Sequence, residues 1–344
     1  MDLKQLATLV RPNIAALSPY STARDEYQGS IGVFLDANES PYPNGFNRYP
    51  DPHQKQLKEK LSAIKQMPVE NIFVGNGSDE AIDLVFRVFC EPGVDNIVAI
   101  TPSYGMYSVC AAINNVALKE VVLGPEFSLT KEEILAACDA HTKAIFLCSP
   151  NNPSGNAFAY EDLMDIVRRS SAMVVVDEAY VDFSEVPSLR FQVNEHPNLI
   201  VYQTLSKAWG LAGLRLGLAF AHPTVIALMS QVKYPYNISE LTQRTVCQAL
   251  EHSIDGQVAE IIQERARVAQ ALETMPCVRK IYPSQANFLL VEVSDADALY
   301  EHLLKDEVIV RNRNKVVGCA NCLRLTIGLK EENEKMLASI QSFK

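Results

Sequence analysis

Between about residue 70 and residue 250, short apolar runs alternate with longer stretches in which apolar residues recur at helical spacing. Most of the short runs are apolar at every position, which is typical of strands buried on both faces of a largely parallel sheet. The predicted strands are 71–74, 96–100, 118–123, 144–148, 173–177, 199–203 and 217–220. The predicted helices between them are 79–89, 104–113, 131–139, 160–170 and 223–231. This alternation predicts an α/β domain with helices on both faces of the sheet.

The two ends of the chain do not show this alternation of predicted strands and helices. Residues 1–45 are rich in Pro, Ser, Asn and Tyr and indicate an arm that wraps around another part of the molecule. After about residue 250, a long helical pattern precedes short predicted strands and two further helices, one of them closing the chain. These elements are strands at 288–293, 308–310 and 322–326 and a helix at 296–305. We therefore expect an N-terminal arm that forms part of a smaller domain (1–45), a large domain (46–250) and a smaller α+β domain (251–344).

Composition narrows the classes of partner. The formal net charge of -10 argues against nucleic acid or an anionic membrane as the main partner, although a few arginines can still form a local anion pocket. We expect no membrane span, because no apolar stretch approaches ~20 residues. We also expect no signal peptide, because residues 1–11 lack an apolar core and a cleavage site with small residues. Many of the eight cysteines lie in apolar runs, which indicates reduced thiols in a cytoplasmic protein. Cys319 and Cys322 form a single CxxC pair, so we predict no zinc site, which needs about four ligands.

Ligands of open α/β sheets bind beyond the carboxyl ends of the strands, and four such ends carry polar groups. They are the loops 75–80 and 149–155, the acidic turn 177–180, and 204–215, where Lys207 stands in an apolar, glycine-rich stretch. Each alone is compatible with an ordinary turn, a helix cap or a surface lysine. The loop 75–80 resembles the dinucleotide pattern GxGxxG, but Glu80 replaces its third glycine, which weakens that interpretation.

Taken together, the four ends resemble the active-site series of the fold-type-I aminotransferases that depend on pyridoxal 5'-phosphate. The series is Asp177, Tyr180, Ser206-Lys207 and Arg215, and the resemblance continues at 35–39, 48–50, 102–105, 152–153 and 324–328. It implies a large domain with a mostly parallel sheet flanked by helices, a smaller α+β domain, and pyridoxal 5'-phosphate as the cofactor.

The resemblance also implies a role for each residue. Lys207 would hold the cofactor covalently and then move a proton as general acid and base. Asp177 would pair with the pyridine nitrogen, and Tyr180 and Asn152 would hydrogen-bond the phenolic oxygen of the ring. The other residues implied to bind the cofactor are Gly77, Ser78, Asp79, Tyr104, Ser206 and Arg215. Tyr49 would reach the cofactor phosphate of the partner subunit in a homodimer.

Within this family, the chain most resembles the members whose amine donor carries a phosphate and no carboxylate. Such a donor needs a second anion site, which the resemblance places on Arg311 and Arg324, with Tyr20 from the arm. The resemblance also implies that Asn38 binds the substrate. The acceptor would be 2-oxoglutarate, which leaves as glutamate.

Three alternatives stay open on the sequence. An aromatic or broad-specificity aminotransferase would share nearly all of these motifs, and a decarboxylase of phosphorylated amino acids shares the fold. A transcription regulator that senses the cofactor would need a basic N-terminal DNA-binding domain, and residues 1–45 are too few and not basic.

Overall fold

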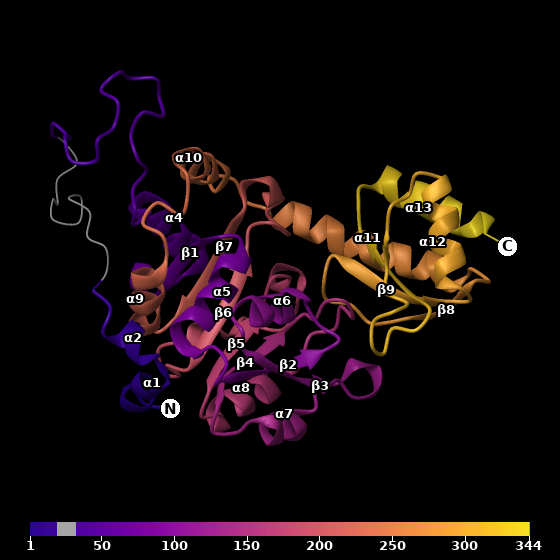
Figure 1. Ribbon diagram of the computed structural model, residues 1–344. Coiled ribbons are helices and arrows are strands. Elements are labelled where there is room, and N and C mark those ends of the chain that lie inside the picture. Colours follow the sequence, from indigo (N-terminus) through magenta and orange to yellow (C-terminus); the bar gives the residue numbers. More distant parts are fainter. Residues whose placement is uncertain (19–31, 344) are drawn as a thin grey trace.

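The computed structural model describes residues 1–18 and 32–343, and the strands of this part of the chain form two separate sheets (Figure 1). The larger sheet has the strand order β1-β7-β6-β5-β4-β2-β3. Its strands are β1 (Ile72–Asn76), β2 (Asn96–Thr101), β3 (Ala117–Val122), β4 (Thr142–Cys148), β5 (Met173–Asp177), β6 (Leu199–Thr204) and β7 (Leu216–Ala221). The strands predicted from apolar runs in this region are confirmed, each within two residues of its expected bounds.

Most strands of the larger sheet run in the same direction. The pairs β3·β2, β2·β4, β4·β5 and β5·β6 are parallel, and only β7 runs against both of its neighbours, β6 and β1. The sheet is therefore mixed but mostly parallel, as the family resemblance implied. As a result, the carboxyl ends of β2, β4, β5 and β6 open onto the same edge.

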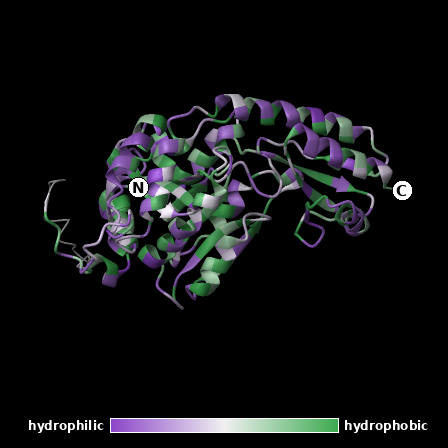
Figure 2. Ribbon diagram, turned by 90° about the horizontal axis from the view of Figure 1, so that it is seen from above, coloured by the Kyte–Doolittle hydropathy of each residue, from purple (hydrophilic) through white to green (hydrophobic). Residues whose placement is uncertain are grey.

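Helices cover both faces of the larger sheet. On β5, Val174 and Val176 pack into one apolar cluster and Met173 and Val175 into another, because successive side chains of a strand point to opposite faces. One cluster includes α4 (Lys55–Lys65), α7 (Lys131–Ala137), α8 (Tyr160–Arg169) and α10 (Glu240–Ala249). The other includes α5 (Ser78–Phe89), α6 (Met106–Ile113) and α9 (Pro223–Val232). Hydrophobic residues accordingly follow the strands of this part, while hydrophilic ones are frequent on the surrounding helices (Figure 2).

The start of the chain packs against the larger sheet rather than against the smaller one. Residues 1–18 contain two short helices, α1 (Leu3–Leu9) and α2 (Pro12–Ala15). Leu6, Leu9 and Ile14 are buried in the same cluster as α5 and α9, and Arg11 Nε lies 3.0 Å from Glu91 Oε2. Burial of these apolar side chains fixes this segment to the large part, which differs from the expectation that residues 1–45 belong in part to the smaller domain.

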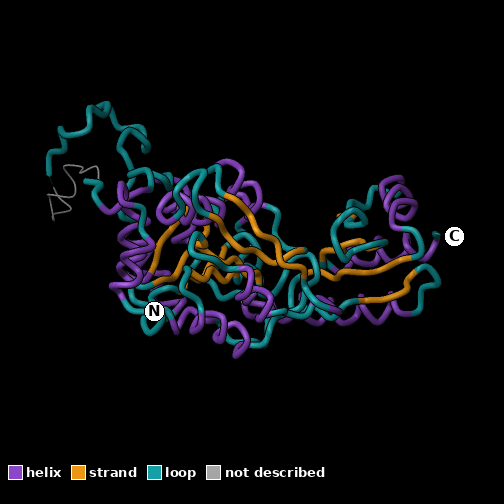
Figure 3. The backbone as a smooth tube through the Cα atoms, turned by 60° about the horizontal axis from the view of Figure 1, so that its bottom comes forward, coloured by secondary structure: helices purple, strands orange, loops and turns teal. Residues whose placement is uncertain are grey.

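The smaller sheet is antiparallel, in the order β10-β11-β9-β8, and lies beyond one end of the larger sheet (Figure 3). Its strands are β8 (Val278–Ile281), β9 (Phe288–Val293), β10 (Arg311–Asn312) and β11 (Cys322–Thr326). The helices α11 (Asp255–Glu273), α12 (Ala296–Lys305) and α13 (Lys330–Ser342) pack on it. The predicted strand 308–310 is wrong, because Val308 and Val310 pack on the apolar cluster while pairing begins at Arg311. No helix in the described residues is long and apolar enough to cross a bilayer.

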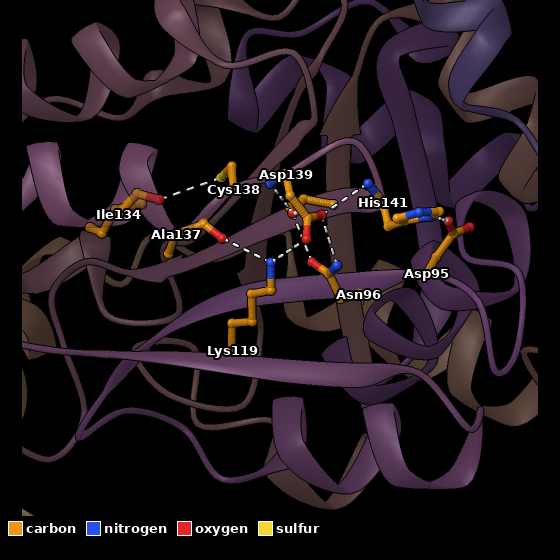
Figure 4. Close-up of polar contacts among 9 residues, drawn as sticks. Asp95, Asn96, Lys119, Ile134, Ala137, Cys138, Asp139 and His141 are labelled. Carbon is orange, nitrogen blue, oxygen red and sulfur yellow. Dashed lines mark hydrogen bonds and ion pairs between the residues drawn. The ribbon is translucent and has the colours of Figure 1, made fainter.

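A polar cluster closes the amino ends of β2 and β4, at the edge opposite to their carboxyl ends (Figure 4). Asp139 accepts hydrogen bonds from Lys119 Nζ at 2.7 Å, from Asn96 Nδ2 at 2.9 Å and from the His141 backbone N–H at 2.9 Å. Thr142 Oγ1 in turn donates to Asn96 Oδ1 at 2.7 Å. These hydrogen bonds pair the polar groups at the amino ends of β2 and β4 with one another. The edge at the carboxyl ends of the strands is the one that can hold a ligand.

Candidate active site

A cavity of about 750 Å³ lies beyond the carboxyl ends of β4, β5 and β6, between the two sheets. Cys148, Asp177 and Thr204, the last residues of these three strands, form part of its wall. The cavity brings together twelve residues that the sequence singled out. They are Gly77, Ser78, Asp79, Tyr104, Asn152, Asp177, Tyr180, Ser206, Lys207, Arg215, Arg311 and Arg324.

Three predicted residues are not in this group. Tyr49 and Asn38 line a separate depression, where the Tyr49 ring stacks on Tyr236 with the centroids 4.4 Å apart. The chain by itself does not bring Asn38 to the cavity, because its segment extends on the side of the molecule away from the smaller sheet (Figure 1). Tyr49 was expected to serve a neighbouring subunit, so its place outside this cavity leaves that prediction untested. Tyr20 lies outside the described residues.

Asp177 is a buried carboxylate at the end of β5, only 3% exposed. Burial raises its pKa to about 6, while hydrogen bonds from Tyr107 and the Ala179 backbone act in the opposite direction. Tyr107 Oη donates to Oδ2 at 2.9 Å and the Ala179 N–H donates to Oδ1 at 3.0 Å. A charge held in this position is stable only when a cationic group meets it, so Asp177 is suited to bind a protonated ring nitrogen.

Lys207 follows β6 and faces the open cavity. Desolvation in the pocket lowers the pKa of its amine, and the nearby positive charges of Arg324 and Arg215 lower it further. The Asp177 carboxylate acts in the opposite direction. The amine is therefore more easily neutral than a surface lysine, and a neutral amine can attack a carbonyl carbon or accept a proton.

The amino end of α5 forms an anion cradle with Arg215. The Gly77 N–H donates to the Arg215 carbonyl at 2.8 Å, and Arg215 Nη2 lies 3.3 Å from Asp79 Oδ2. Gly77 has a φ of +76°, and a Cβ placed there would lie 2.7 Å from Arg215 Nη2. Ser206 adds a buried hydroxyl with no hydrogen-bond partner in the described part of the chain. Helix-end N–H groups, a hydroxyl and a guanidinium together favour a bound phosphate.

Two tyrosines border the space between this cradle and Lys207. Tyr104 Oη donates to Asp79 Oδ1 at 3.0 Å, and the Tyr180 ring packs edge-on against Phe288 with centroids 5.1 Å apart. Burial raises the pKa of both phenols. Both therefore remain protonated near neutral pH, so that each can donate a hydrogen bond.

The far end of the cavity carries positive charge from the smaller sheet. Arg324 on β11 stands opposite Arg311 on β10, and its Nη1 donates to Asn152 Oδ1 at 2.5 Å. Arg324 Nε is buried without a hydrogen-bond partner in the described residues. Burial is also the main reason why the pKa of Arg324 is lowered. This end of the cavity is suited to a second anion, separate from the one at the α5 cradle.

The sequence interpretation missed two side chains that contribute to this site, Tyr107 and Arg313. Tyr107 holds Asp177, and Arg313 lines the cavity beside the other two arginines. A signal for each was present in the sequence. Tyr107 stands three residues after Tyr104, which is neighbour spacing on a helix, and Arg313 stands two after Arg311, which is same-face spacing on a strand.

Comparison with known proteins yields one family. The model of the family described as aminotransferase class I and II matches residues 33–340. The histidinol-phosphate aminotransferase of Parabacteroides distasonis is 51% identical over 344 residues, which cover 99% of this chain and 100% of that protein.

Among solved structures, the histidinol-phosphate aminotransferase of Sinorhizobium meliloti, in complex with pyridoxal-5'-phosphate, has a TM-score of 0.79 at 22% identity and covers 89% of each chain. The L-threonine-O-3-phosphate decarboxylase of Porphyromonas gingivalis has a TM-score of 0.73 at 19% identity, covering 86% of this chain and 90% of that one. At these identities, the likeness to solved structures shows the fold alone.

Proposed function

The chain belongs to the class I and II aminotransferase family, and from this membership we propose that it transfers the amino group of L-histidinol phosphate to 2-oxoglutarate, with pyridoxal 5'-phosphate as cofactor. The products are imidazole acetol phosphate and L-glutamate, and the reaction belongs to histidine biosynthesis. The observation that carries this proposal is a single cavity with Lys207 and Asp177 in its middle, an anion cradle at one end and an arginine group at the other. A donor with a phosphate and no carboxylate needs that second anion site.

The residues fit the proposed cofactor. Asp177 would pair with the ring nitrogen, and the amino end of α5, Ser206 and Arg215 would hold the phosphate; all of them line the same cavity. The unpartnered hydroxyl of Ser206 gains an acceptor in this arrangement. When bound, the cofactor supplies an electron sink that makes the proton on the amine-bearing carbon removable.

Lys207 has two tasks in the proposed mechanism. Its amine would hold the cofactor before the donor arrives, and its neutral form would afterwards accept, at Nζ, the proton of the amine-bearing carbon. The lowered pKa of this amine favours both tasks.

The neighbouring groups orient the ring and stabilise charge. Tyr180 would donate from its protonated phenol to the phenolic oxygen of the ring. Arg324 engages Asn152 Oδ1, so Asn152 Nδ2 would be left to donate to the same oxygen. Asp177 would keep its negative charge against the ring nitrogen, and Tyr107 and the Ala179 N–H hold its carboxylate in place.

The second anion site selects the donor. We assign the distal phosphate of the donor to Arg311 and Arg324, with Tyr20 and Asn38 as further substrate-binding residues contributed by the N-terminal segment. The same arginines serve a carboxylate of 2-oxoglutarate in the second half-reaction.

The proposed assembly is a homodimer in the cytoplasm, with Tyr49 of each subunit reaching the cofactor phosphate of the other. The segment that carries Tyr49 exposes large apolar side chains, with Val33 89%, Leu35 86% and Phe46 62% exposed. Exposed apolar residues of this kind are typical of surfaces that another protein covers.

A spectral titration of the purified holoenzyme tests the function. Histidinol phosphate should convert the cofactor absorbance at lower concentration and faster than Phe, Tyr or Asp does, and 2-oxoglutarate should restore it. The Lys207→Ala variant is the control, because it should bind the cofactor without the pH-sensitive absorbance of the covalent form and should lose multiple turnover. A preference for Phe or Tyr would indicate an aromatic aminotransferase instead. Release of carbon dioxide without an acceptor would indicate a decarboxylase.

A further inference from the structure

We propose that Arg313 is a third guanidinium of the distal anion site and that it gives this site its preference for a doubly charged phosphate over a singly charged carboxylate. The inference rests on the proposed function, since it concerns how the donor's phosphate is recognised. It concerns a residue that the family resemblance did not single out.

The alternation of side chains in the β10–β11 hairpin places three arginines on one face. Arg311 pairs with Arg324, and the ladder continues beyond β10 because the Arg313 N–H donates to the Cys322 carbonyl at 2.9 Å. Residues two apart on a strand face the same side, so Arg313 shares the face of Arg311. All three arginines line the cavity.

The intervening residue faces the other way. Asn312 pairs with Leu323, which is buried against α12, and Asn312 Nδ2 donates to Asp297 Oδ1 on that helix at 2.7 Å. The hairpin therefore has one face that packs on the core of the smaller part and one face that presents guanidinium groups to the cavity.

The described part of the protein does not compensate the three positive charges. Within residues 1–18 and 32–343, none of the three arginines forms an ion pair with a carboxylate. The Nε atoms of Arg313 and Arg324 are buried without a hydrogen-bond partner in the same residues. Burial, followed by repulsion from Arg324 and Arg311, lowers the pKa of Arg313 to about 10. Arg311 is exposed, whereas Arg313 and Arg324 are partly desolvated. A cluster of cations of this kind is unfavourable, and a bound anion would relieve both the repulsion and the missing hydrogen bonds.

Three guanidinium groups match a phosphate better than a carboxylate. Arg324 already gives one N–H to Asn152, so it has fewer donors left for a ligand. A carboxylate offers two oxygens and one charge, which two guanidinium groups can satisfy. A phosphate monoester offers three oxygens and about -1.5 to -2 charges at neutral pH, so a third guanidinium adds more to phosphate binding than to carboxylate binding.

The test compares Arg313→Gln with the wild type as holoenzymes, in which the cofactor's own phosphate occupies the α5 cradle. The measured quantity is the ratio of kcat/KM for histidinol phosphate to kcat/KM for unphosphorylated histidinol. We expect this ratio to fall about 10-fold or more, because a charge-assisted contact to the phosphate is lost. Inhibition by inorganic phosphate should weaken by a similar factor, whereas the KM for 2-oxoglutarate should change less than 3-fold.

Two further variants separate recognition of the donor's phosphate by Arg313 from a role of Arg313 in stabilising the hairpin. Arg279→Gln removes an exposed arginine of the smaller sheet that does not line the cavity, so it should leave the ratio unchanged. Arg313→Lys keeps the charge with fewer donors and should retain part of the ratio. Should Arg313→Gln fail to fold, the Lys variant decides alone, because a wild-type ratio in it would exclude a role for the guanidinium fork.

The outcomes distinguish this inference from the proposed function. A wild-type enzyme without preference for the phosphorylated donor contradicts the proposed function. A wild type with that preference and an Arg313→Gln variant that keeps the ratio and the phosphate inhibition overturns the inference alone. A loss equal for both donors, with lowered thermal stability, would show that Arg313 only supports the hairpin and would also overturn it.

Discussion

At the scale of single residues, the Asp177 carboxylate is held where an unpaired charge is unfavourable, and this has opposite effects on folding and on chemistry. The folded chain binds a proton at Asp177 more tightly than the unfolded chain does, since burial raises its pKa from about 4 to about 6. Ionised Asp177 therefore disfavours the folded cofactor-free protein. The stability cost appears as the pH rises from about 4 and is complete above the folded pKa.

Asp177→Asn should consequently make the cofactor-free protein more stable and the enzyme less active. At pH 8, we expect its free energy of unfolding to exceed that of the wild type by about 3 kcal/mol, with most of the difference lost near pH 4. The kcat should fall at least ~100-fold, about 2.7 kcal/mol of barrier, because the ring nitrogen loses its anionic partner. Urea unfolding of the cofactor-free proteins between pH 4 and pH 8, together with steady-state kinetics, measures both effects.

Tyr107→Phe is the matched control for this prediction. It removes one of the two hydrogen bonds that stabilise the charged form, so the stability transition of Asp177 should move to higher pH while the carboxyl remains. A stability difference between Asp177→Asn and wild type that is the same at pH 4 and pH 8 would contradict the assigned cause. An Asp177→Asn enzyme within a few-fold of wild-type kcat would reduce Asp177 to a structural role.

At the scale of elements, the anion cradle depends on how closely β7 approaches the loop before α5. Gly217 on β7 pairs with Gly75 on β1, and a Cβ at position 217 would lie 2.2 Å from the Ser78 nitrogen and 2.4 Å from the Gly77 carbonyl carbon. Backbone atoms cannot yield at such distances without moving the loop. The absence of a side chain at Gly217 therefore sets the position of the N–H groups at the start of α5.

We expect Gly217→Ala to displace this loop and to lower both cofactor affinity and stability. Overpacking of this kind costs about 1–3 kcal/mol, so the melting temperature should fall by several degrees. Cofactor dissociation measured by absorbance and thermal unfolding would report the two effects. Gly213→Ala is the matched control, because no atom of the described residues lies within 4 Å of a Cβ there. Equal behaviour of the two variants would show that the loop is not held by β7.

The elements also show how far the sequence could predict this structure. The apolar run of β5 predicted its strand within the observed bounds, because burial on both faces leaves no polar position before Asp177 at its end. The hairpin strand β10 was placed three residues too early, since Val308 and Val310 alternate like a strand but contact an apolar cluster instead. The Tyr107–Asp177 bond joins residues 70 positions apart. The spacing of Tyr107 from Tyr104 could indicate a side chain near the site, but not this contact with Asp177.

At the scale of the whole molecule, the cavity is assembled from two sheets, whereas Tyr49 lies in a depression elsewhere on the surface. A residue so placed can serve a cofactor site only across a subunit boundary or after its segment moves. The exposed apolar side chains of residues 33–46 favour the first explanation, because their burial would stabilise a dimer.

Mixed dimers test the shared site. An inactive Lys207→Ala subunit paired with an inactive Tyr49→Ala subunit leaves one site with both residues intact, provided that Tyr49 serves the partner. Random exchange of the two variants should then restore about a quarter of wild-type activity, since half of the dimers are mixed and each has one intact site. Activity assays on subunits carrying different tags, with the mixed species purified, measure this recovery. No recovery in verified mixed dimers, or an active monomer, would contradict a shared site.

The division of the cavity between two sheets has a consequence for how this enzyme can diverge. The groups that we propose to perform the reaction lie on the larger sheet and its loops, between residues 75 and 215. The three cavity arginines all lie in the β10–β11 hairpin. Changes confined to this one hairpin could therefore alter which amine is accepted, while the groups of the larger sheet stay unchanged. Gene duplication followed by drift in that hairpin is then a short path from one metabolic role to another.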